Sequence, residues 1–526
     1  MSSSGEATIK CADADSHGTT KLLRESQSPA TGAMMMTGDA GVDEVRAYLP
    51  DLKDKRVLLL GAGIRQNTEA LAQLAGHLTL ADHNQDVLDS IKTTCLPQDH
   101  ISFMCGDVTE LEFAGGSFDL VFVDRLLTSL GDDDLTRVLV RILDWLTPGG
   151  YLFILETCDL RSGHWCPDMP TVFRSPLQYF QMLQATTSTQ AAFTPIRAKS
   201  CLSYIQHKGD PSQLCILAER VNKDEQVTET HFPHSVIFQM EWLLGNTWNS
   251  TEGETTTREF CLGLGLVPGQ RVLDVGSGGG ESAFFMARYY GVHVHGVDLS
   301  SNMFCLALQR QATLEEKLRK RIHFEMKDIL EGDYPAGSFD VIYSRNVLLY
   351  IHQKAELLRK FKGWLKPGGT LFITDYCRGT ASPSQDVFDF ENRRRRGLEV
   401  RYTGENNTSG TSTVISLLVI RKKRNNFQTV RKMRVTEGLE DFGESRPLNM
   451  VTVDDYSELM RSSGFTEVKV EDFGPQYSRT KEAELRAILP TRLAFLQEYP
   501  QEVFDDLVNI TRNKRVYEMG LVIHYA

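Results

Sequence analysis

Residues 271–298 restrict the fold of this chain more than any other stretch, and they read RVLDVGSGGGESAFFMARYYGVHVHGVD. A short apolar run at 271–275 leads into four glycines within 276–280, and a second apolar run ends at Asp298. The glycines allow a sharp turn from strand to helix and let a ligand approach the backbone closely. This order predicts a buried strand, a glycine turn, a helix and a second strand.

Two acids flank the glycine turn. Asp298 lies 20 residues after Gly278, at the end of the second strand, where a carboxylate can accept hydrogen bonds from both hydroxyls of a ribose. Asp274 precedes the first glycine by two residues, and Glu281 stands where the G-x-G-x-x-G pattern of dinucleotide sites has its last glycine. A pyrophosphate prefers an unobstructed helix N-terminus, so an acid here suits the cationic end of S-adenosylmethionine better. The segment therefore predicts an adenosyl site for S-adenosylmethionine.

The same plan occurs again at 56–83, and later segments repeat with it. GSFDLVFVDRLLTSL at 116–130 matches GSFDVIYSRNVLLYI at 337–351, and WLTPGGYLFILETC at 145–158 matches WLKPGGTLFITDYC at 364–377. Two copies about 220 residues apart predict two similar domains in tandem. Each copy alternates apolar strands with amphipathic helices, which predicts an α/β fold with doubly wound sheets and ligands at the carboxyl ends of the strands.

In the second copy we expect seven strands, the last of them antiparallel. They lie near 271–275, 293–298, 322–327, 339–344, 369–376, 467–473 and 517–525. The intervening stretch at 398–446 is polar and basic, and we interpret it as an insertion. The expected division of the chain is a disordered tail at 1–30, a first domain at 31–222 and a second domain at 223–526.

Composition narrows the class of protein. The net charge of −12 argues against nucleic-acid binding, which needs a basic face. The ten cysteines lack metal-type spacing, and no signal peptide precedes them, which favours free thiols in a reducing compartment. No apolar run approaches the length of a membrane span. We therefore expect a cytoplasmic protein with no metal, no nucleic-acid partner and no membrane span.

The two copies differ where a cofactor would bind. In the first copy Leu59 replaces the acid before the glycine turn, and Arg65 replaces a glycine of the turn. A cation there would repel a sulfonium. Asp82 and Asp107 still match Asp298 and Asp328 of the second copy, so the acids expected at the ribose and the adenine are retained. We predict that the second copy is the better cofactor site.

The motifs LGAGI, GDV and ETC in the first copy, with VLDVGSG, GVDLSSNM, YSR, WLKPGG and ITDYC in the second, resemble one family. It is the tandem phosphoethanolamine N-methyltransferases of plants, nematodes and some other animals, and YSR with ITDYC is the most specific part of the likeness. The resemblance runs from about Ala33 to Ala526, apart from the insertion. It implies two tandem class I methyltransferase (Rossmann-like) domains, each a mostly parallel seven-stranded sheet with an antiparallel last strand. It also implies methylation of phosphoethanolamine to phosphocholine, for phosphatidylcholine synthesis, with S-adenosylmethionine as cofactor.

The resemblance places cofactor contacts at the carboxyl ends of the strands of the second copy. They are Gly276, Gly278, Asp298, Ser300, Asp328, Ile329 and Arg345, and Asp274 joins them from the spacing argument above. For Asp328 alone, a cap at the end of a strand is an equally good interpretation.

The amine side departs from the pattern of the family. Phe232 and Tyr350 stand where the family has a paired tyrosine and histidine, and Asn346 stands where it has an acid after YSR. His231 or His352 could replace the histidine through a water, although an ordinary surface histidine is the commoner interpretation of each.

The phosphate side is preserved in part. Tyr376 matches one of the two phosphate-binding tyrosines of the family. The arginine is Arg396 or Arg446, depending on where the insertion begins, and Arg446 is our choice. A leucine and Ile523 occupy the remaining positions.

Three functions are compatible with these residues. The first is an active N-methyltransferase of phosphoethanolamine or its methylated forms. The second is a pseudoenzyme that binds the cofactor and regulates an active relative, and the third is a methyltransferase for another small acceptor. We rank the first highest because the tandem layout and the motifs match as a set.

Overall fold

The structure is a computed structural model of the 526-residue chain. It describes residues 38–61, 65–94, 99–160, 171–226, 253–377, 451–472, 488–498 and 518–525, together with 422–423, 426–427 and the single residues 486, 501 and 504. We call residues 38–226 the first half and residues 253–525 the second half. The expected tail at 1–30 and most of the expected insertion lie outside the described residues.

Seven strands of the first half form one sheet. They are β1 (Arg56–Leu60), β2 (His77–Asp82), β3 (Ile101–Cys105), β4 (Phe118–Asp124), β5 (Leu146–Thr157), β6 (Ala191–Ser200) and β7 (Gln213–Asn222). Their order is β3-β2-β1-β4-β5-β7-β6, in which β7 runs antiparallel to the other six strands. Crossover helices connect the parallel strands, as this topology requires.

The second half repeats this arrangement. Its strands are β8 (Arg271–Val275), β9 (His293–Asp298), β10 (Ile322–Met326), β11 (Phe339–Arg345), β12 (Leu365–Cys377), β15 (Glu467–Asp472) and β16 (Glu518–Tyr525). Their order is β10-β9-β8-β11-β12-β16-β15, with β16 antiparallel. The seven expected strands and the antiparallel last strand are confirmed, and β12 begins at Leu365 rather than near 369.

The helices connect and cover these strands. In the first half they are α1 (Gly38–Arg46), α2 (Arg65–Leu74), α3 (Gln85–Thr94), η1 (Leu127–Ser129), α4 (Asp132–Trp145), α5 (Pro176–Ala185), α6 (Leu202–Lys208) and η2 (Lys223–Glu225). In the second half they are α8 (Gly253–Leu264), α9 (Glu281–Tyr290), α10 (Ser301–Ala312), α11 (Glu316–Arg319), η3 (Ile329–Glu331), η4 (Leu348–Tyr350), α12 (Lys354–Trp364), α14 (Val453–Ser462), η5 (Leu489–Thr491) and α16 (Arg492–Glu498). A separate two-stranded ribbon joins β13 (Lys422–Lys423) to β14 (Asn426–Phe427).

Helix α4 shows how the sequence produces these elements. It opens with three acids at 132–134, which complement the positive end of the helix dipole. Its buried residues include Leu135, Val138, Leu139 and Ile142, at the spacing of one helical face. That face packs against the sheet, so the pattern sets which side of the helix is buried.

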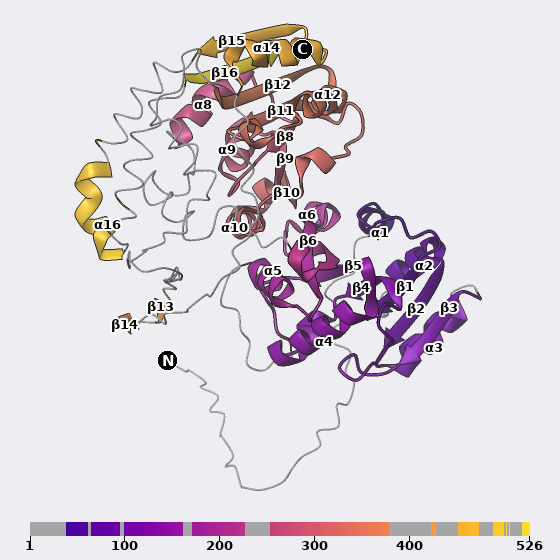
Figure 1. Ribbon diagram of the computed structural model, residues 1–526. Helices are drawn as coiled ribbons and strands as arrows, with labels where there is room; N and C mark the ends of the chain where they lie inside the picture. The colour runs from indigo at the N-terminus through magenta and orange to yellow at the C-terminus, as the bar shows by residue number, and fades with distance from the viewer. Residues whose placement is uncertain are drawn as a thin grey trace, which may run out of the picture.

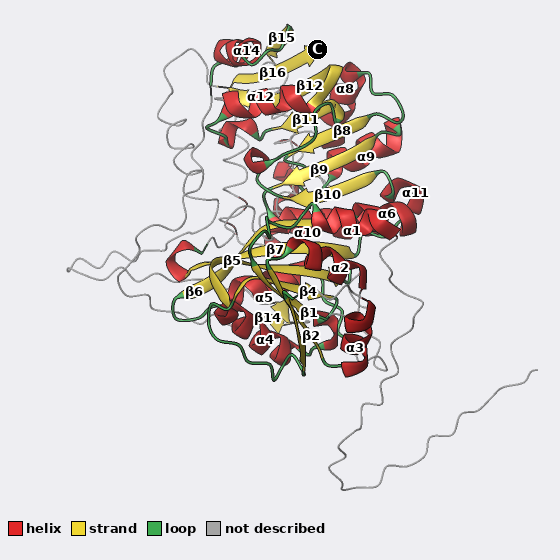
Figure 2. Ribbon diagram, turned by 90° about the vertical axis from the view of Figure 1, so that its right-hand side faces the viewer, coloured by secondary structure: helices red, strands yellow, loops and turns green. Residues whose placement is uncertain are grey.

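The two halves share a single sheet of fourteen strands, which the sequence did not show (Figures 1 and 2). Strand β6 of the first half pairs antiparallel with β10 of the second, in the register Glu325↔Lys199 and Met326↔Ala198. Across the same junction, Phe180 of α5 packs edge-on against Phe304 of α10 at 6.4 Å between ring centroids. The buried core is therefore continuous from one half into the other. No helix within the described ranges has the length and apolar character needed to span a membrane.

Candidate functional site

The glycine turn of the second half joins β8 to α9. Gly276 and Gly280 have φ angles of 70° and 90°, which favour glycine. A Cβ at Gly276 would collide with Val347, and one at Gly280 would lie 2.7 Å from the rings of Phe284 and Phe324. The turn therefore requires glycine both for its backbone conformation and for its packing.

Asp298 is held beside this turn by two backbone donors. Its Oδ2 accepts a hydrogen bond from the N–H of Gly278 at 2.8 Å, and its Oδ1 accepts one from the N–H of Ser300 at 2.9 Å. Burial raises the pKa of Asp298, and these N–H groups oppose the rise. Each carboxylate oxygen has a second lone pair, so the oriented group can still accept a pair of ribose hydroxyls.

Asp274 lies near the carboxyl end of β8 and is only 2% exposed. Its Oδ2 is buried and has no hydrogen-bond partner among the described residues. Burial, together with the charges of Glu281 and Asp298, raises its pKa to about 8, and Arg345 opposes the rise. A buried carboxyl group without a partner is unfavourable, and a cationic ligand would relieve the cost.

Two further buried oxygens without a partner in the described part of the chain lie at the same end of the sheet. They are Oδ1 of Asn346, which follows β11, and Oγ1 of Thr374 on β12. Strands β8, β11 and β12 are parallel neighbours, so these groups and Asp274 lie together at the carboxyl ends of the strands. This end of the sheet thus carries three polar atoms that a ligand could satisfy, and it fits the ammonium and carboxylate of S-adenosylmethionine.

Arg345 and Asp328 have contacts within the protein. The Arg345 guanidinium donates to Oγ1 of Thr257 at 3.0 Å and to Oγ1 of Thr256, so it ties the end of β11 to α8. Oδ1 of Asp328 accepts from the N–H of Leu330 at 2.9 Å and caps η3, which places the buried Ile329 in the first turn. The cap expected as the alternative interpretation of Asp328 is therefore present, and it fixes the orientation of the carboxylate after the carboxyl end of β10.

The amine-side positions are described only in part. Asn346 adopts a φ of 58°, a left-handed conformation that Asn and Asp tolerate best among non-glycine residues, and its N–H donates to the carbonyl of Thr374 at 2.7 Å. Tyr350 is the half-buried last residue of η4, and His352 is exposed, as an ordinary surface histidine would be. Phe232, with its neighbour His231, lies outside the described residues, so its distance to Tyr350 is not defined.

The phosphate-side positions are described still less. Tyr376 is placed in β12 by its backbone alone, and the backbone of Ile523 pairs with Phe372. Arg396 and Arg446 lie outside the described residues.

Comparison with known proteins identifies the family. Two family models, both described as a methyltransferase domain, match residues 57–150 and 266–406. Phosphoethanolamine N-methyltransferase 1 of Arabidopsis thaliana is 31% identical over 90% of this chain and 87% of its own length. The enzyme of the same name from Zea mays is 32% identical over 89% of this chain and 85% of its own.

The chain belongs to the phosphoethanolamine N-methyltransferase family. A solved structure of phosphoethanolamine N-methyltransferase 2 from Haemonchus contortus, in complex with S-adenosyl-L-methionine, matches with a TM-score of 0.67 over 94% of this chain and 99% of that one. The sequence identity of that pair is 18%, so the match supports the fold. The tandem methyltransferase fold expected from the sequence is thus confirmed.

The first half of this family member differs from the second at the positions where the second half has its unpaired oxygens. Leu59, at the position of Asp274, is 1% exposed. Asn67 donates from Nδ2 to Oδ2 of the buried Asp124 at 2.8 Å, and Arg125 donates from Nε to Oδ1 of Asp124 at 3.0 Å. Side chains of the protein therefore satisfy the carboxylate at the end of β4.

The two acids that the first half retains are oriented much like those of the second. Oδ1 of Asp82 accepts from the N–H of Asn84 at 2.9 Å, and Oδ1 of Asp107 accepts from the N–H of Thr109 at 2.9 Å. These are turn contacts that a ribose or adenine site shares with any strand end. Retained acids alone therefore do not indicate a second cofactor site.

A buried polar group on α12, β12 and α14 was not predicted. Tyr456 of α14 donates to Oδ2 of Asp375 at 2.7 Å, and Nζ of Lys354 donates to the carbonyl of Ile351 at 2.6 Å. Burial lowers the pKa of Lys354 to about 8, and the Asp375 carboxylate opposes this shift. The only signal in the sequence was Asp375, a charged residue within the apolar ITDYC strand. The Tyr456–Asp375 bond thus joins α14 to β12, and Lys354 of α12, whose charge interacts with Asp375, bonds to Ile351 at the end of η4.

Proposed function

We propose that the chain is an S-adenosylmethionine-dependent N-methyltransferase that acts on phosphoethanolamine or its methylated forms. The observation that carries the proposal is the set of three unpaired buried oxygens, on Asp274, Asn346 and Thr374, beside the glycine turn of a family member. Cofactor binding belongs to the second domain at 223–526, whereas the first domain at 31–222 is a degenerate copy. A cytoplasmic location and a small phosphorylated amine as partner accord with this function.

The residues of the chain would act mainly by positioning. Bound S-adenosylmethionine supplies a methyl group activated by its sulfonium. Asp298 would accept hydrogen bonds from the ribose hydroxyls, and Asp328 and Ile329 would contact the adenine. Asp274 would bind the ammonium of the amino-acid end. Holding two reactants in line and in contact can supply much of the acceleration of a displacement. No residue has to form a covalent bond.

The acceptor nitrogen must lose a proton before it can accept the methyl group, because its lone pair is the nucleophile. Tyr350 and Asn346, with Phe232, occupy the positions where the family places groups around this amine. A phenol and an amide are weaker proton acceptors there than an imidazole and a carboxylate. Tyr376 and Arg446 would hold the phosphate. The proposed enzyme is therefore expected to be slower than relatives that retain the histidine and the acid.

A pseudoenzyme is the second candidate, and the replacement of all three amine-side residues favours it. The test is a methyl-transfer assay of the full chain with phosphoethanolamine, followed by titration calorimetry with S-adenosylmethionine. Turnover of phosphoethanolamine supports the enzyme. Cofactor binding without turnover of any amine supports the pseudoenzyme, and turnover only of phosphate-free acceptors supports the third function.

A further inference from the structure

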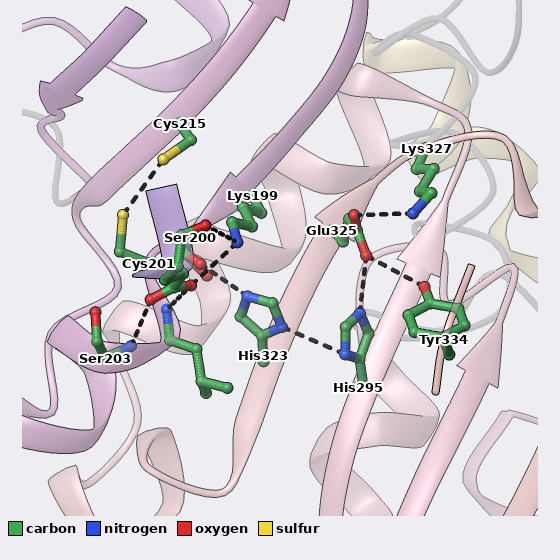
Figure 3. Close-up of polar contacts among 12 residues, drawn as sticks. Lys199, Ser200, Cys201, Ser203, Cys215, His295, His323, Glu325, Lys327 and Tyr334 are labelled. Carbon is green, nitrogen blue, oxygen red and sulfur yellow. Dashed lines mark hydrogen bonds and ion pairs between the residues drawn. The ribbon is translucent and has the colours of Figure 1, made fainter. Parts of the chain in front are cut away.

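Where the halves meet, a buried polar cluster crosses from one to the other (Figure 3). We call Glu44, Lys199, His295, His323 and Glu325 the junction cluster. His323 and Glu325 lie on β10, which pairs with β9 on one side and with β6 of the first half on the other. Within the described residues, no group of His, Cys, Asp or Glu is arranged to hold a metal ion. The cluster is therefore best understood through its hydrogen bonds.

Hydrogen bonds lead from the backbone of the first half to Glu325. Nε2 of His323 lies 2.7 Å from the carbonyl of Ser200, and Nδ1 of His323 lies 3.5 Å from Nδ1 of His295. Burial lowers the pKa of His323 to about 4, so its ring is neutral near pH 7 and donates to Ser200 from Nε2. Nδ1 of His323 is then the acceptor, and His295 supplies the proton between the rings.

His295 also contacts Glu325, because its Nε2 lies 3.1 Å from Oε2 of that carboxylate. The ring of His295 thus links His323 to Glu325. Burial opposes the charge of Glu325, but the bond to His295 and the positive charges around it, including Lys327, lower its pKa. The chain of contacts thus ends on an ionised carboxylate.

Glu325 in turn contacts residues on both sides of the positions proposed to bind the adenine. Its Oε1 lies 3.5 Å from Nζ of Lys327, the residue before Asp328, and its Oε2 accepts from the hydroxyl of Tyr334 at 3.2 Å. Tyr334 follows η3, so the segment 327–334 contains Asp328 and Ile329, the two residues proposed to contact the adenine. One carboxylate therefore contacts the first and the last residue of this segment.

The first half provides a rigid anchor for this chain of contacts. Glu44 of α1 accepts from the N–H groups of Leu202 at 2.7 Å and Ser203 at 2.8 Å, and it pairs with Nζ of Lys199 at 3.3 Å. These contacts hold the start of α6 and the end of β6, and Ser200 lies between them. The carbonyl that His323 contacts is thus fixed by two elements of the first half.

We propose that the first half is a positioning support for the cofactor site of the second, acting through His323, His295 and Glu325 on the segment 327–334. The inference rests on the proposed function, because it assumes that this segment binds the adenine of S-adenosylmethionine. A degenerate copy would then be retained for the geometry it imposes rather than for chemistry of its own. His323 and Glu325 are positioning residues that act through Asp328 and Ile329.

The test uses the full chain with two variants and a matched control. His323→Asn keeps an acceptor near the Nδ1 position but cannot reach the carbonyl of Ser200. Glu325→Gln keeps the size of the side chain and removes its charge. His100→Asn is the control, because Nε2 of His100 lies 2.9 Å from the carbonyl of Ala72, which is the same type of contact away from the junction.

We expect the dissociation constant of S-adenosylmethionine to rise roughly three- to tenfold in His323→Asn, which loses one hydrogen bond. In Glu325→Gln, which loses a charge, it should rise roughly ten- to thirtyfold. The kcat at saturating cofactor and the KM for the amine should stay within about twofold. Without cofactor, hydrogen exchange of segment 327–334 should be faster in both variants than in the control.

The outcomes separate this inference from the proposed function. Unchanged affinity and unchanged exchange in both variants, in a parent that binds S-adenosylmethionine, overturn the inference and leave the function intact. An equal loss of affinity in His100→Asn overturns it as well, because the effect would then be general. A parent that does not bind the cofactor overturns the proposed function, and unchanged exchange at 327–334 then overturns the inference independently.

Discussion

Asp274 should make cofactor binding release a proton. Its pKa of about 8 means that the carboxyl is mostly neutral at pH 7 in the free protein. A cationic ammonium placed beside it favours the ionised form, so binding shifts the pKa downward. The substitution Asp274→Asn keeps the shape of the group and removes its titration.

The number of protons released follows from the difference between the pH and the pKa of Asp274. One pH unit below the pKa, about nine-tenths of the Asp274 groups carry a proton, so binding should release up to about 0.9 proton per cofactor. Ionising the group at pH 7 costs about 1.4 kcal/mol of the binding free energy. Affinity should therefore improve by about five- to sixfold between pH 7 and pH 8, and by about a further twofold above pH 8.

As the pH rises, the free energy of unfolding should fall, whereas the affinity for the cofactor should rise. The pKa of Asp274 is raised in the folded protein above the ordinary value of 3.8, so the folded state holds a proton that the unfolded state has lost. The free protein should then lose stability as the pH rises from about 4 to about 8, and Asp274→Asn should remove this part of the pH dependence.

Titration calorimetry with S-adenosylmethionine at pH 7, in two buffers of different ionisation enthalpy, measures the released proton directly. The parent should show a binding enthalpy that depends on the buffer, and Asp274→Asn should show a smaller dependence. Protons released by the ligand itself are common to both proteins and cancel in the comparison. Equal buffer dependence in parent and variant would refute the assignment of Asp274 to the cationic end of the cofactor.

Three further outcomes are expected. Asp298→Ala should weaken S-adenosylmethionine binding by about 1–3 kcal/mol for each ribose hydroxyl left unpaired, and parental affinity in calorimetry would contradict its role. Phe232→Tyr with Tyr350→His should raise phosphoethanolamine turnover roughly ten- to a thousandfold and more than additively, which a methyl-transfer assay of the single and double variants checks. Tyr456→Phe should cost about 1–3 kcal/mol of unfolding free energy, because a buried carboxylate on β12 loses one of its donors. Urea denaturation should show a smaller cost for Tyr48→Phe, whose hydroxyl has no partner among the described residues.

The sequence predicted those parts of the structure that depend on local pattern. The turn at 276–280 and its contact with Asp298 follow from glycine spacing and from the length of one strand-helix-strand unit. The repeat predicted that both halves share one architecture, because each copy carries the same alternation of strands and helices. The substitutions Leu59 and Asn346 were visible only by comparing one copy with the other or with a family.

The junction could not be predicted in the same way. IHFEM at 322–326 alternates apolar and polar residues, a pattern typical of a strand with one face in water. All five residues are buried: His323 contacts the carbonyl of Ser200 in the first half, and Glu325 contacts His295 and Tyr334 of the second. His323 and Ser200 are 123 residues apart, and no local pattern specifies their contact. The bond between Tyr456 and Asp375 spans 81 residues and was missed for the same reason.

The continuous sheet also determines how the two halves can be separated in the laboratory. Joined, they leave β3 and β15 as the two outer strands of the described sheet. Cut apart, they would also expose the unpaired backbone groups of β6 and β10, and such exposed strands are templates for pairing with other chains. Either half expressed alone should therefore self-associate through these strands, and a binding assay on such a fragment would report on the aggregate rather than on the half as it exists in the intact protein.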